Sequence, residues 1–260
     1  MSTWDIDRAA TVLLEAEDTR TDRAAITEEW PGLDLTTAYA VQDETLRRRL
    51  ERGEKLTGVK LGLTSRAKQQ RMNVASPLTA WLTDAMVLPA GDPVAQDRLI
   101  HPRAEPEIVF VMRDRVAGPG VTAAAALAAV GSVHAGIEVI DSRYRDFKFT
   151  LPDVVADNAS SGCYVTGPVG RPPEALDLAL EACLVEVDGQ VVDSATGAAV
   201  QGHPAEALAL AANDLGRRGH AIEPGWVVLT GGMTDAVFVP PGAKVAAHFT
   251  NLGSVFLAGG

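Results

Sequence analysis

The chain has 260 residues, of which 47% are apolar and 22% charged, and this is enough apolar material for one large or two small globular domains. Its 34 acidic residues outnumber its 23 Lys and Arg residues, and the net charge of -11 would be repelled by a nucleic-acid backbone or an anionic membrane surface. The two cysteines, Cys163 and Cys183, are too few for a disulfide framework and are typical of a reducing compartment.

The N-terminus gives no sign of export. It becomes acidic at Asp5, where a signal peptide would carry basic residues followed by an apolar stretch. The most apolar run, residues 121–130, is mainly alanine and is well short of the roughly 20 residues that span a bilayer. We therefore expect a soluble, cytoplasmic protein with no membrane and no nucleic-acid partner.

The N-terminal part of the chain is predicted to be helical. Ile6, Ala9 and Leu13 recur at helical spacing, and Thr36 is placed to cap a second helix that ends at Gly53. Residues 1–57 are thus predicted to form a helical appendage.

From Gly58 onward, short apolar runs alternate with Gly and Pro, a pattern typical of closely spaced strands. Two helices interrupt it, one capped by Thr122 and one from Pro204 to Gly216. We predict an α+β fold in which residues 58–260 form one integrated, β-rich catalytic region, a rolled or barrel-like mixed sheet with the N-terminal helices as a cap. The predicted strands cover residues 59–63, 86–88, 107–112, 136–140, 163–166, 184–187, 227–229, 236–239, 244–249 and 254–257.

Two glutamates open the strand predicted near residue 107. On a strand, Glu105 and Glu107 point to one face about 6.5 Å apart, and Val109 and Val111 continue that face. Two carboxylates at an apolar surface repel each other and lose solvation, so that one pKa rises or a cation is needed. The alternative is a strand end that is simply solvated.

Glu138 lies inside another apolar strand, where an ionisable group needs a partner. Three glutamates without Cys or His at zinc spacing offer hard oxygen ligands, which favour Mg²⁺ or Mn²⁺ over Zn²⁺. The competing interpretation is an ion pair between Glu138 and Arg103 or Arg143.

Lys60 is flanked by apolar and small residues that would let a ligand approach the backbone. It could act as an electrophile or proton donor, or it could merely extend its ammonium group to solvent from a strand end. Asp84 could pair with it, although Asp is also common in turns.

Two small polar loops, residues 157–162 and 230–234, adjoin apolar runs. Loops of this composition can offer hydroxyl groups and backbone amides to a carboxylate, although most are ordinary turns. The five histidines share no ligand spacing.

Four segments, GVKLGLTSR (58–66), HPRAEPEIVF (101–110), IEVIDSRY (137–144) and VADNASSG (155–162), resemble the hydratase/decarboxylase family of the meta-cleavage pathways, within the fumarylacetoacetate hydrolase superfamily. The resemblance covers nearly the whole chain and implies a fumarylacetoacetate hydrolase-like fold. It also implies an enzyme without an organic cofactor and a homo-oligomer, associated with a sister hydratase. The residue roles that it implies are Glu105, Glu107 and Glu138 as ligands of Mg²⁺ or Mn²⁺, Lys60 and Asp84 as the acid/base pair, and Ser161 and Thr230 as substrate contacts.

Two activities share this site in the family, and residues 146–149, 197–204 and 230–234 resemble the decarboxylase. The expected reaction is decarboxylation of 2-oxohex-3-enedioate to 2-hydroxypenta-2,4-dienoate and CO₂, with Phe147 and Phe149 as an apolar wall beside the departing carboxylate. The alternatives are 2-oxopent-4-enoate hydratase and a non-catalytic scaffold. Phe238, where proline is expected, departs from the pattern.

Overall fold

The computed structural model of the chain describes residues 3–65, 69–70, 77–94 and 96–260. The helices are α1 (Ile6–Thr19), α2 (Ile26–Glu29), α3 (Leu35–Glu51), α5 (Ala123–Ala128), α6 (Leu151–Ala156) and α7 (Pro204–Arg217), with short 3-10 turns η1 (Asp84–Met86), η2 (Gln96–Arg98), η3 (Arg145–Phe147), η4 (Asn158–Ser160), η5 (Pro173–Ala175) and η6 (Gly197–Ala199). The strands are β1 (Leu56–Gly62), β2 (Leu78–Thr83), β3 (Arg103–Met112), β4 (Val130–Ile140), β5 (Ser161–Thr166), β6 (Ala182–Val187), β7 (Gln190–Thr196), β8 (Val227–Leu229), β9 (Val237–Phe238), β10 (Lys244–Phe249) and β11 (Gly253–Ala258).

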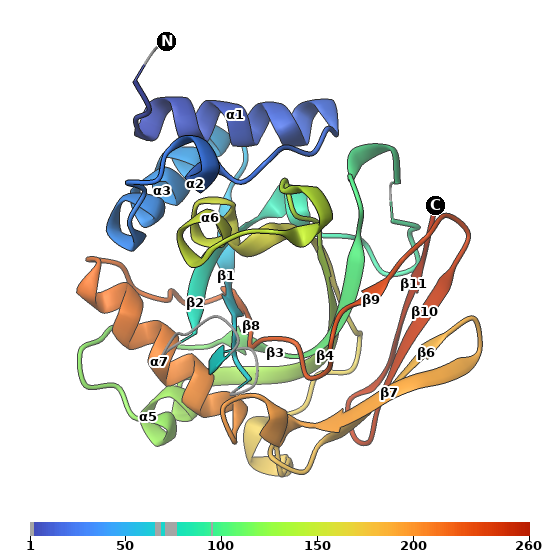
Figure 1. The fold of residues 1–260 in the computed structure, drawn as a ribbon. Helices are drawn as coiled ribbons and strands as arrows, with labels where there is room; N and C mark the ends of the chain where they lie inside the picture. The colour runs from blue at the N-terminus through green and yellow to red at the C-terminus, as the bar shows by residue number, and fades with distance from the viewer. Residues whose placement is uncertain (1–2, 66–68, 71–76, 95) are drawn as a thin grey trace.

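The larger of the two sheets in the described part of the chain is strongly curled (Figure 1). Its strand order is β2-β1-β8-β3-β4-β5, and β9 pairs with the start of β3. The β1–β8 pair is parallel and the remaining pairs are antiparallel, so the sheet is mixed. The predicted α+β fold with a rolled mixed sheet is therefore confirmed.

The outer face of this sheet packs against a second sheet of order β11-β10-β6-β7 and against α7. Alternate residues of β3, such as Ile108 and Phe110, are fully buried in the resulting core together with Val185 and Leu208. The residues between them, among them Glu107 and Val109, point to the inner face because side chains alternate along a strand. The main core thus stabilises one face of the curled sheet and leaves the other for the site.

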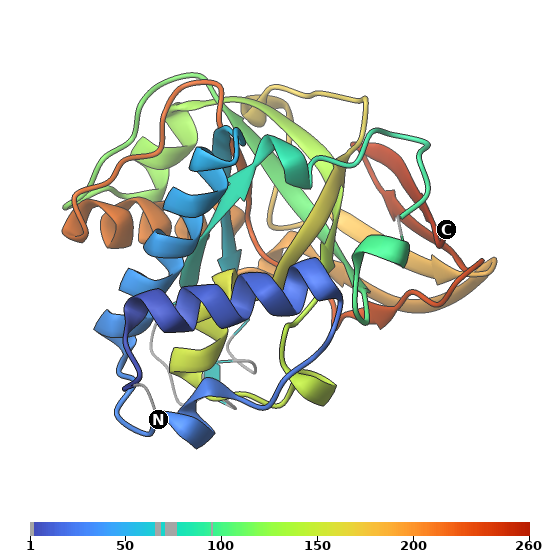
Figure 2. The same ribbon diagram turned by 90° about the horizontal axis from the view of Figure 1, so that it is seen from above.

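The N-terminal helices α1, α2 and α3 pack with α6 over one end of the curled sheet (Figures 1 and 2). Their shared core includes Ile26, Val41 and the fully buried Tyr144. The second long helix begins two residues earlier than predicted, because Asp34 rather than Thr36 is the cap, and its carboxylate accepts a hydrogen bond from the Thr37 N–H at 2.7 Å.

Three details of the predicted strands are wrong. Residues 86–88 form the end of a 3-10 turn and a single bridge, while the real partner of β1 is β2, in which every residue is buried. A strand that is buried on both faces shows no alternation of apolar and polar residues in the sequence, so this pattern could not predict β2. The largely exposed edge strand β7 was also missed. Within the described ranges, no helix is both long and apolar enough to cross a membrane.

Candidate active site

Three glutamates converge on the inner face of the curled sheet. Glu105 on β3 lies directly opposite Glu138 on β4, and Glu107 lies two residues further along β3 on the same face. One carboxylate oxygen from each residue lies within 4.8 Å of the other two. The pairing of two antiparallel strands thus joins residues that are 31 to 33 positions apart in the sequence.

These carboxylates are removed from solvent: Glu105 is 9% exposed, Glu107 0% and Glu138 1%. Burial raises the pKa of Glu107 well above its ordinary value, and repulsion by Glu138 and Glu105 raises it further. Burial also raises the pKa of Glu138, while Lys60 opposes that rise. Among the described residues, Glu107 Oε1 and Glu138 Oε2 accept no hydrogen bond. The site therefore holds buried negative charge that its own donors do not satisfy.

Lys60 supplies one positive charge to this cluster. Its Nζ lies 3.0 Å from Glu138 Oε1 and donates a hydrogen bond of 2.8 Å to the backbone oxygen of Ala159. The partner of Glu138 is thus Lys60, and the alternative pairs with Arg103 or Arg143 do not form. Three carboxylates and one ammonium group leave two negative charges when all four groups are ionised.

The loop that holds Lys60 is itself unusual. Asn158, Ala159 and Ser160 have positive φ angles of 49°, 49° and 57°, a left-handed turn that costs free energy in residues other than glycine. The Asn158 side chain bonds the backbone N and O of Trp81, each at 2.9 Å, and the buried Arg143 bonds the backbone oxygens of Asp157 and Ser161. These contacts fix the oxygen that Lys60 meets, and nothing in the sequence pattern had indicated them.

Among the predicted site residues, Asp84 is the one that the structure places outside the site. Lys60 pairs with Ala80 across β1 and β2, and Asp84 lies four residues further on, beyond the end of β2. It is exposed, and its carboxylate accepts a hydrogen bond from the Lys55 N–H at 2.8 Å. The predicted Lys60–Asp84 acid/base pair is therefore wrong, because the antiparallel register carries Asp84 away from Lys60.

The loop after β8 contacts two of the three triad glutamates. The Gly231 N–H donates to Glu107 Oε2 at 2.7 Å, and a Cβ at Gly232 would lie 2.7 Å from Glu105 Cδ. Gly231 has a φ of 110°, and a side chain there would meet Thr64. The paired glycines in the sequence are the signal for this close approach, and the structure places them against the triad, where the sequence predicts contact with a substrate carboxylate.

The predicted substrate contacts lie in different surroundings. Ser161 and Thr230 are buried and donate to the backbone oxygens of Asn158 (2.8 Å) and Ile108 (2.7 Å). Phe147 lies beside Arg103, whose guanidinium carbon is 4.2 Å from the ring centre, whereas Phe149 packs at the edge of the N-terminal core, 6.2 Å from Tyr144. Substrate contact by these four residues remains a prediction, and the two phenylalanine rings have different neighbours.

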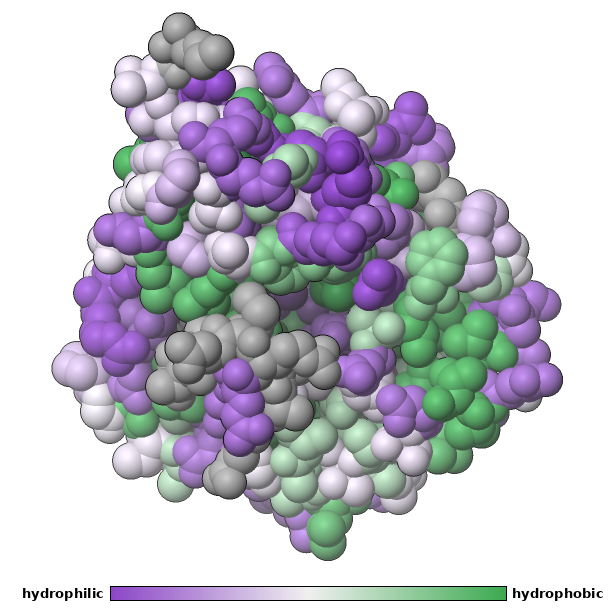
Figure 3. Space-filling model, viewed as in Figure 1, coloured by the Kyte–Doolittle hydropathy of each residue, from purple (hydrophilic) through white to green (hydrophobic). Residues whose placement is uncertain are grey.

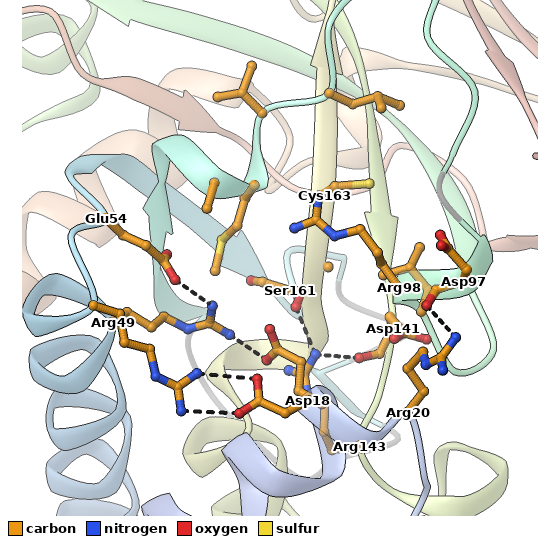
Figure 4. A pocket seen from close by; sticks show the side chains of 18 residues that line it. Asp18, Arg20, Arg49, Glu54, Asp97, Arg98, Asp141, Arg143, Ser161 and Cys163 are labelled. Atoms are coloured by element: carbon orange, nitrogen blue, oxygen red, sulfur yellow. Dashed lines mark hydrogen bonds and ion pairs between the residues drawn. The ribbon is translucent and has the colours of Figure 1, made fainter.

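A separate cavity of about 530 Å³ lies between the C-terminal ends of α1 and α3 and strand β5 (Figure 4). Its charged walls are largely satisfied internally: Arg49 pairs with Glu17 and Glu54, and Arg52 pairs with Asp18. None of the three triad glutamates lines it. The balanced charges give this cavity no chemistry comparable to that of the triad.

The raised pKa of Glu107 predicts how stability depends on pH. A carboxyl group whose pKa is higher in the folded protein than in the unfolded chain stabilises the fold at low pH, and this contribution is lost as the pH rises through the folded pKa. In the presence of a metal chelator, we therefore expect the melting temperature to fall over the pH range above the ordinary pKa of a glutamate carboxyl, about 4.5. Glu107→Gln should reduce this fall. A melting temperature that rises over this interval, with the same slope in the variant, would contradict the assignment of buried charge.

Comparisons with known proteins agree with the geometry of the site. Residues 55–256 match the family model described as fumarylacetoacetate (FAA) hydrolase C-terminal. A 4-oxalocrotonate decarboxylase of Pseudomonas putida is 44% identical over 230 residues, 88% of this chain and 87% of the relative, and a 2-hydroxyhexa-2,4-dienoate hydratase of Comamonas testosteroni is 41% identical, covering 93% and 92%. The solved structure of 4-oxalocrotonate decarboxylase from Pseudomonas putida G7, complexed with magnesium and adipate, superimposes with a TM-score of 0.94 at 38% identity and covers 99% of both chains.

Proposed function

The chain belongs to the fumarylacetoacetate hydrolase family, and on that premise we propose that it catalyses the metal-dependent decarboxylation of 2-oxohex-3-enedioate (4-oxalocrotonate) to 2-hydroxypenta-2,4-dienoate and CO₂. The 4-oxalocrotonate decarboxylase of Pseudomonas putida, 44% identical, and the solved decarboxylase with a TM-score of 0.94 support this choice. The reaction belongs to the meta-cleavage catabolism of aromatic compounds.

The observation that carries the proposal is the buried triad of Glu105, Glu107 and Glu138. Its ligand atoms lie close enough to share one ion, and two of its oxygens have no hydrogen-bond donor among the described residues. When all three carboxylates and Lys60 are ionised, the cluster carries two negative charges. Oxygen donors without thiolate or imidazole suit Mg²⁺ or Mn²⁺. The residues present therefore fit a divalent cation, and the solved relative carries magnesium.

The chemistry requires an acceptor for an electron pair. The bond between C5 and the C6 carboxylate breaks, CO₂ leaves, and the pair moves through C4 and C3 to the C2 oxygen, giving a dienolate that takes one proton. A divalent cation held by the triad would supply a Lewis acid for the 2-oxo acid end of the substrate. No organic cofactor is needed for this electron flow.

Within the chain, Lys60 is placed to stabilise the developing negative charge. Its ammonium group has three hydrogens, and the described residues offer it two partners, Glu138 and the oxygen of Ala159. The remaining hydrogen can be donated to the C2 oxygen as that oxygen becomes an enolate, when the interaction is strongest. The rigid left-handed turn at residues 158–160 keeps the ammonium group from moving away.

The alternative is the hydratase reaction, because a hydratase is 41% identical to the chain. Hydration needs an acid or base at the distal alkene carbon, and the residue predicted for acid/base chemistry beside Lys60, Asp84, is exposed and bonded to Lys55. This acid/base candidate is therefore not in place for hydration, whereas decarboxylation does not require it. An intact set of triad and lysine also disfavours the non-catalytic scaffold.

Separate measurement of the two products tests the proposal. With Mg²⁺, the enzyme is expected to release CO₂ from 2-oxohex-3-enedioate and to form 2-hydroxypenta-2,4-dienoate, seen by its diene absorbance. It should hydrate that dienoate slowly or not at all. Rapid formation of 4-hydroxy-2-oxopentanoate from the dienoate, without CO₂ release from the dicarboxylate, would assign the hydratase reaction instead.

We propose in addition that the chain forms a homo-oligomer and associates with a sister hydratase. Supporting this, large apolar side chains are exposed on the second sheet: Leu184 (45%), Val191 (56%) and Phe256 (63%). Figure 3 shows hydrophobic side chains gathered over this part of the molecule. Apolar patches of this kind are typical of surfaces that another chain covers.

A further inference from the structure

Arg103 begins strand β3 on the same face as the triad. It lies two residues before Glu105, so its side chain leaves the strand on the inner face, about 6.5 Å further along. Exposure rises in this direction, from 0% at Glu107 to 9% at Glu105 and to the half-buried Arg103. Arg103 therefore stands between the buried triad and the solvent.

The surroundings of Arg103 are apolar and aromatic. The Phe147 ring lies 4.2 Å from its guanidinium carbon, and its partners in the strand register are Ile140 on β4 and Phe238 on β9. Among the described residues, no carboxylate forms an ion pair with it. An arginine that forms no ion pair among the described residues, at the entrance to the triad, can bind an anionic group of a ligand.

The backbone holds Phe147 under the guanidinium group at a cost. Asp146 and Phe147 have φ angles of 56° and 55°, in the left-handed region that residues other than glycine rarely adopt. The same ring also contacts His101, 4.8 Å between centres, and the buried Nε2 of that histidine has no hydrogen-bond partner in the described part of the chain. A strained turn that orients an aromatic ring against one cation restricts where that cation can point.

We propose that Arg103, stacked on Phe147, binds the second carboxylate of a dicarboxylate whose 2-oxo acid end lies at the triad. This inference rests on the proposed function for the orientation of the substrate. The five bonds of an extended six-carbon dicarboxylate span about 6 Å, close to the rise of two strand residues that separates Arg103 from Glu105. Arg103 is thereby a specificity residue that distinguishes dicarboxylates from monocarboxylates.

The kinetic consequence is specific. Arg103 interacts with the carboxylate before it is lost as CO₂, so it contributes to substrate binding and not to the stabilisation of the dienolate. Arg103→Gln should therefore raise KM for the dicarboxylate without lowering kcat. The assignment also replaces part of the earlier expectation for Phe147, because the ring supports a cation instead of presenting a bare apolar wall.

The binding test compares adipate with hexanoate, which has the same chain length and one carboxylate fewer. Calorimetric titration of the whole protein in excess Mg²⁺ should show tighter binding of adipate, and Arg103→Gln should weaken adipate binding by about 10-fold or more while leaving hexanoate unchanged. Phe147→Leu, which keeps the arginine, should weaken adipate binding by less. Arg145→Gln is the matched control. Arg145 is exposed, lies on the same 3-10 turn as Phe147 and pairs with Asp22.

The outcomes separate this inference from the proposed function. If the wild-type protein binds hexanoate as tightly as adipate, or if Arg103→Gln weakens both equally, Arg103 does not bind the second carboxylate, whether or not CO₂ is released. If adipate selectivity depends on Arg103 and no CO₂ is released, the subsite stands and the proposed decarboxylation fails. A melting curve for Arg103→Gln that matches the wild type will show that the fold is preserved.

Discussion

Glu107→Gln is expected to abolish decarboxylation and to leave the fold intact. The amide has nearly the same volume, and its oxygen can still accept the Gly231 N–H, but one of three anionic ligands is lost. Substitution of a residue that only supports a metal ligand typically lowers metal affinity 10- to 100-fold. Loss of a ligand itself should lower Mg²⁺ affinity by on the order of 10²-fold or more. Calorimetry for the ion, circular dichroism for the fold and a CO₂ assay for activity measure the three effects.

A matched control for this variant is Glu181→Gln. Glu181 is also a buried carboxylate, 1% exposed, but it accepts hydrogen bonds from Asn251 and is not part of the triad. Its substitution should leave Mg²⁺ affinity unchanged. Normal turnover with a normal Mg²⁺ dependence in Glu107→Gln would remove Glu107 from the site.

Lys60→Ala should lower kcat by on the order of 10²-fold or more, with a smaller effect on KM. Lys60 is 3% exposed and meets Glu138 and Ala159, so its charge is fixed in a site shielded from water. A preorganised donor contributes most when negative charge develops on the oxygen that it faces, and loss of one such donor typically costs this much in rate. Steady-state kinetics with 2-oxohex-3-enedioate at saturating Mg²⁺ measures both constants.

Two controls accompany Lys60→Ala. Lys55→Ala removes an exposed lysine from just before the same strand and should change neither constant appreciably. Asp84→Asn should likewise retain activity within a few-fold, because Asp84 is outside the site. If KM alone rises in Lys60→Ala, the lysine binds substrate without assisting the reaction, and a large loss of kcat in Asp84→Asn would restore the acid/base pair.

The triad could be predicted from the sequence because its physical basis is local. Glu105 and Glu107 are related by the alternation of a single strand, and Glu138 stands out as a charge inside an apolar run. Neither pattern depends on knowing which strands pair. The buried charge at these positions could therefore be inferred before the β3–β4 register was known.

The surroundings of the triad depend on register and on loop conformation, which single-sequence patterns do not contain. Proximity in the sequence and the family resemblance both suggest Asp84 as the partner of Lys60, but antiparallel pairing places Ala80 opposite Lys60. The left-handed turn at residues 158–160 and the buried Arg143–Asp157 ion pair have no periodic signal, since both are stabilised by contacts between distant segments. The edge strand β7 escaped prediction for a related reason, because its largely exposed side chains show no buried face.

The division of the chain into a helical appendage, residues 1–57, and a catalytic region, residues 58–260, remains a prediction. The first strand starts at Leu56, near the predicted boundary. However, the N-terminal core also contains Leu78, Tyr144 and Val155, which come from the β-rich region. We propose that the helices act as a cap whose core is completed by the catalytic region.

The proposed reaction depends on one divalent cation held by the three carboxylates. The most direct test of this cation site is an anomalous difference map from crystals grown with Mn²⁺, which locates the ion without reference to activity. We predict one peak per chain, bounded by Glu105, Glu107 and Glu138 and absent in crystals of Glu107→Gln. A map with no peak between these carboxylates, or with its main peak in the cavity beside Arg49 and Arg143, would contradict the account.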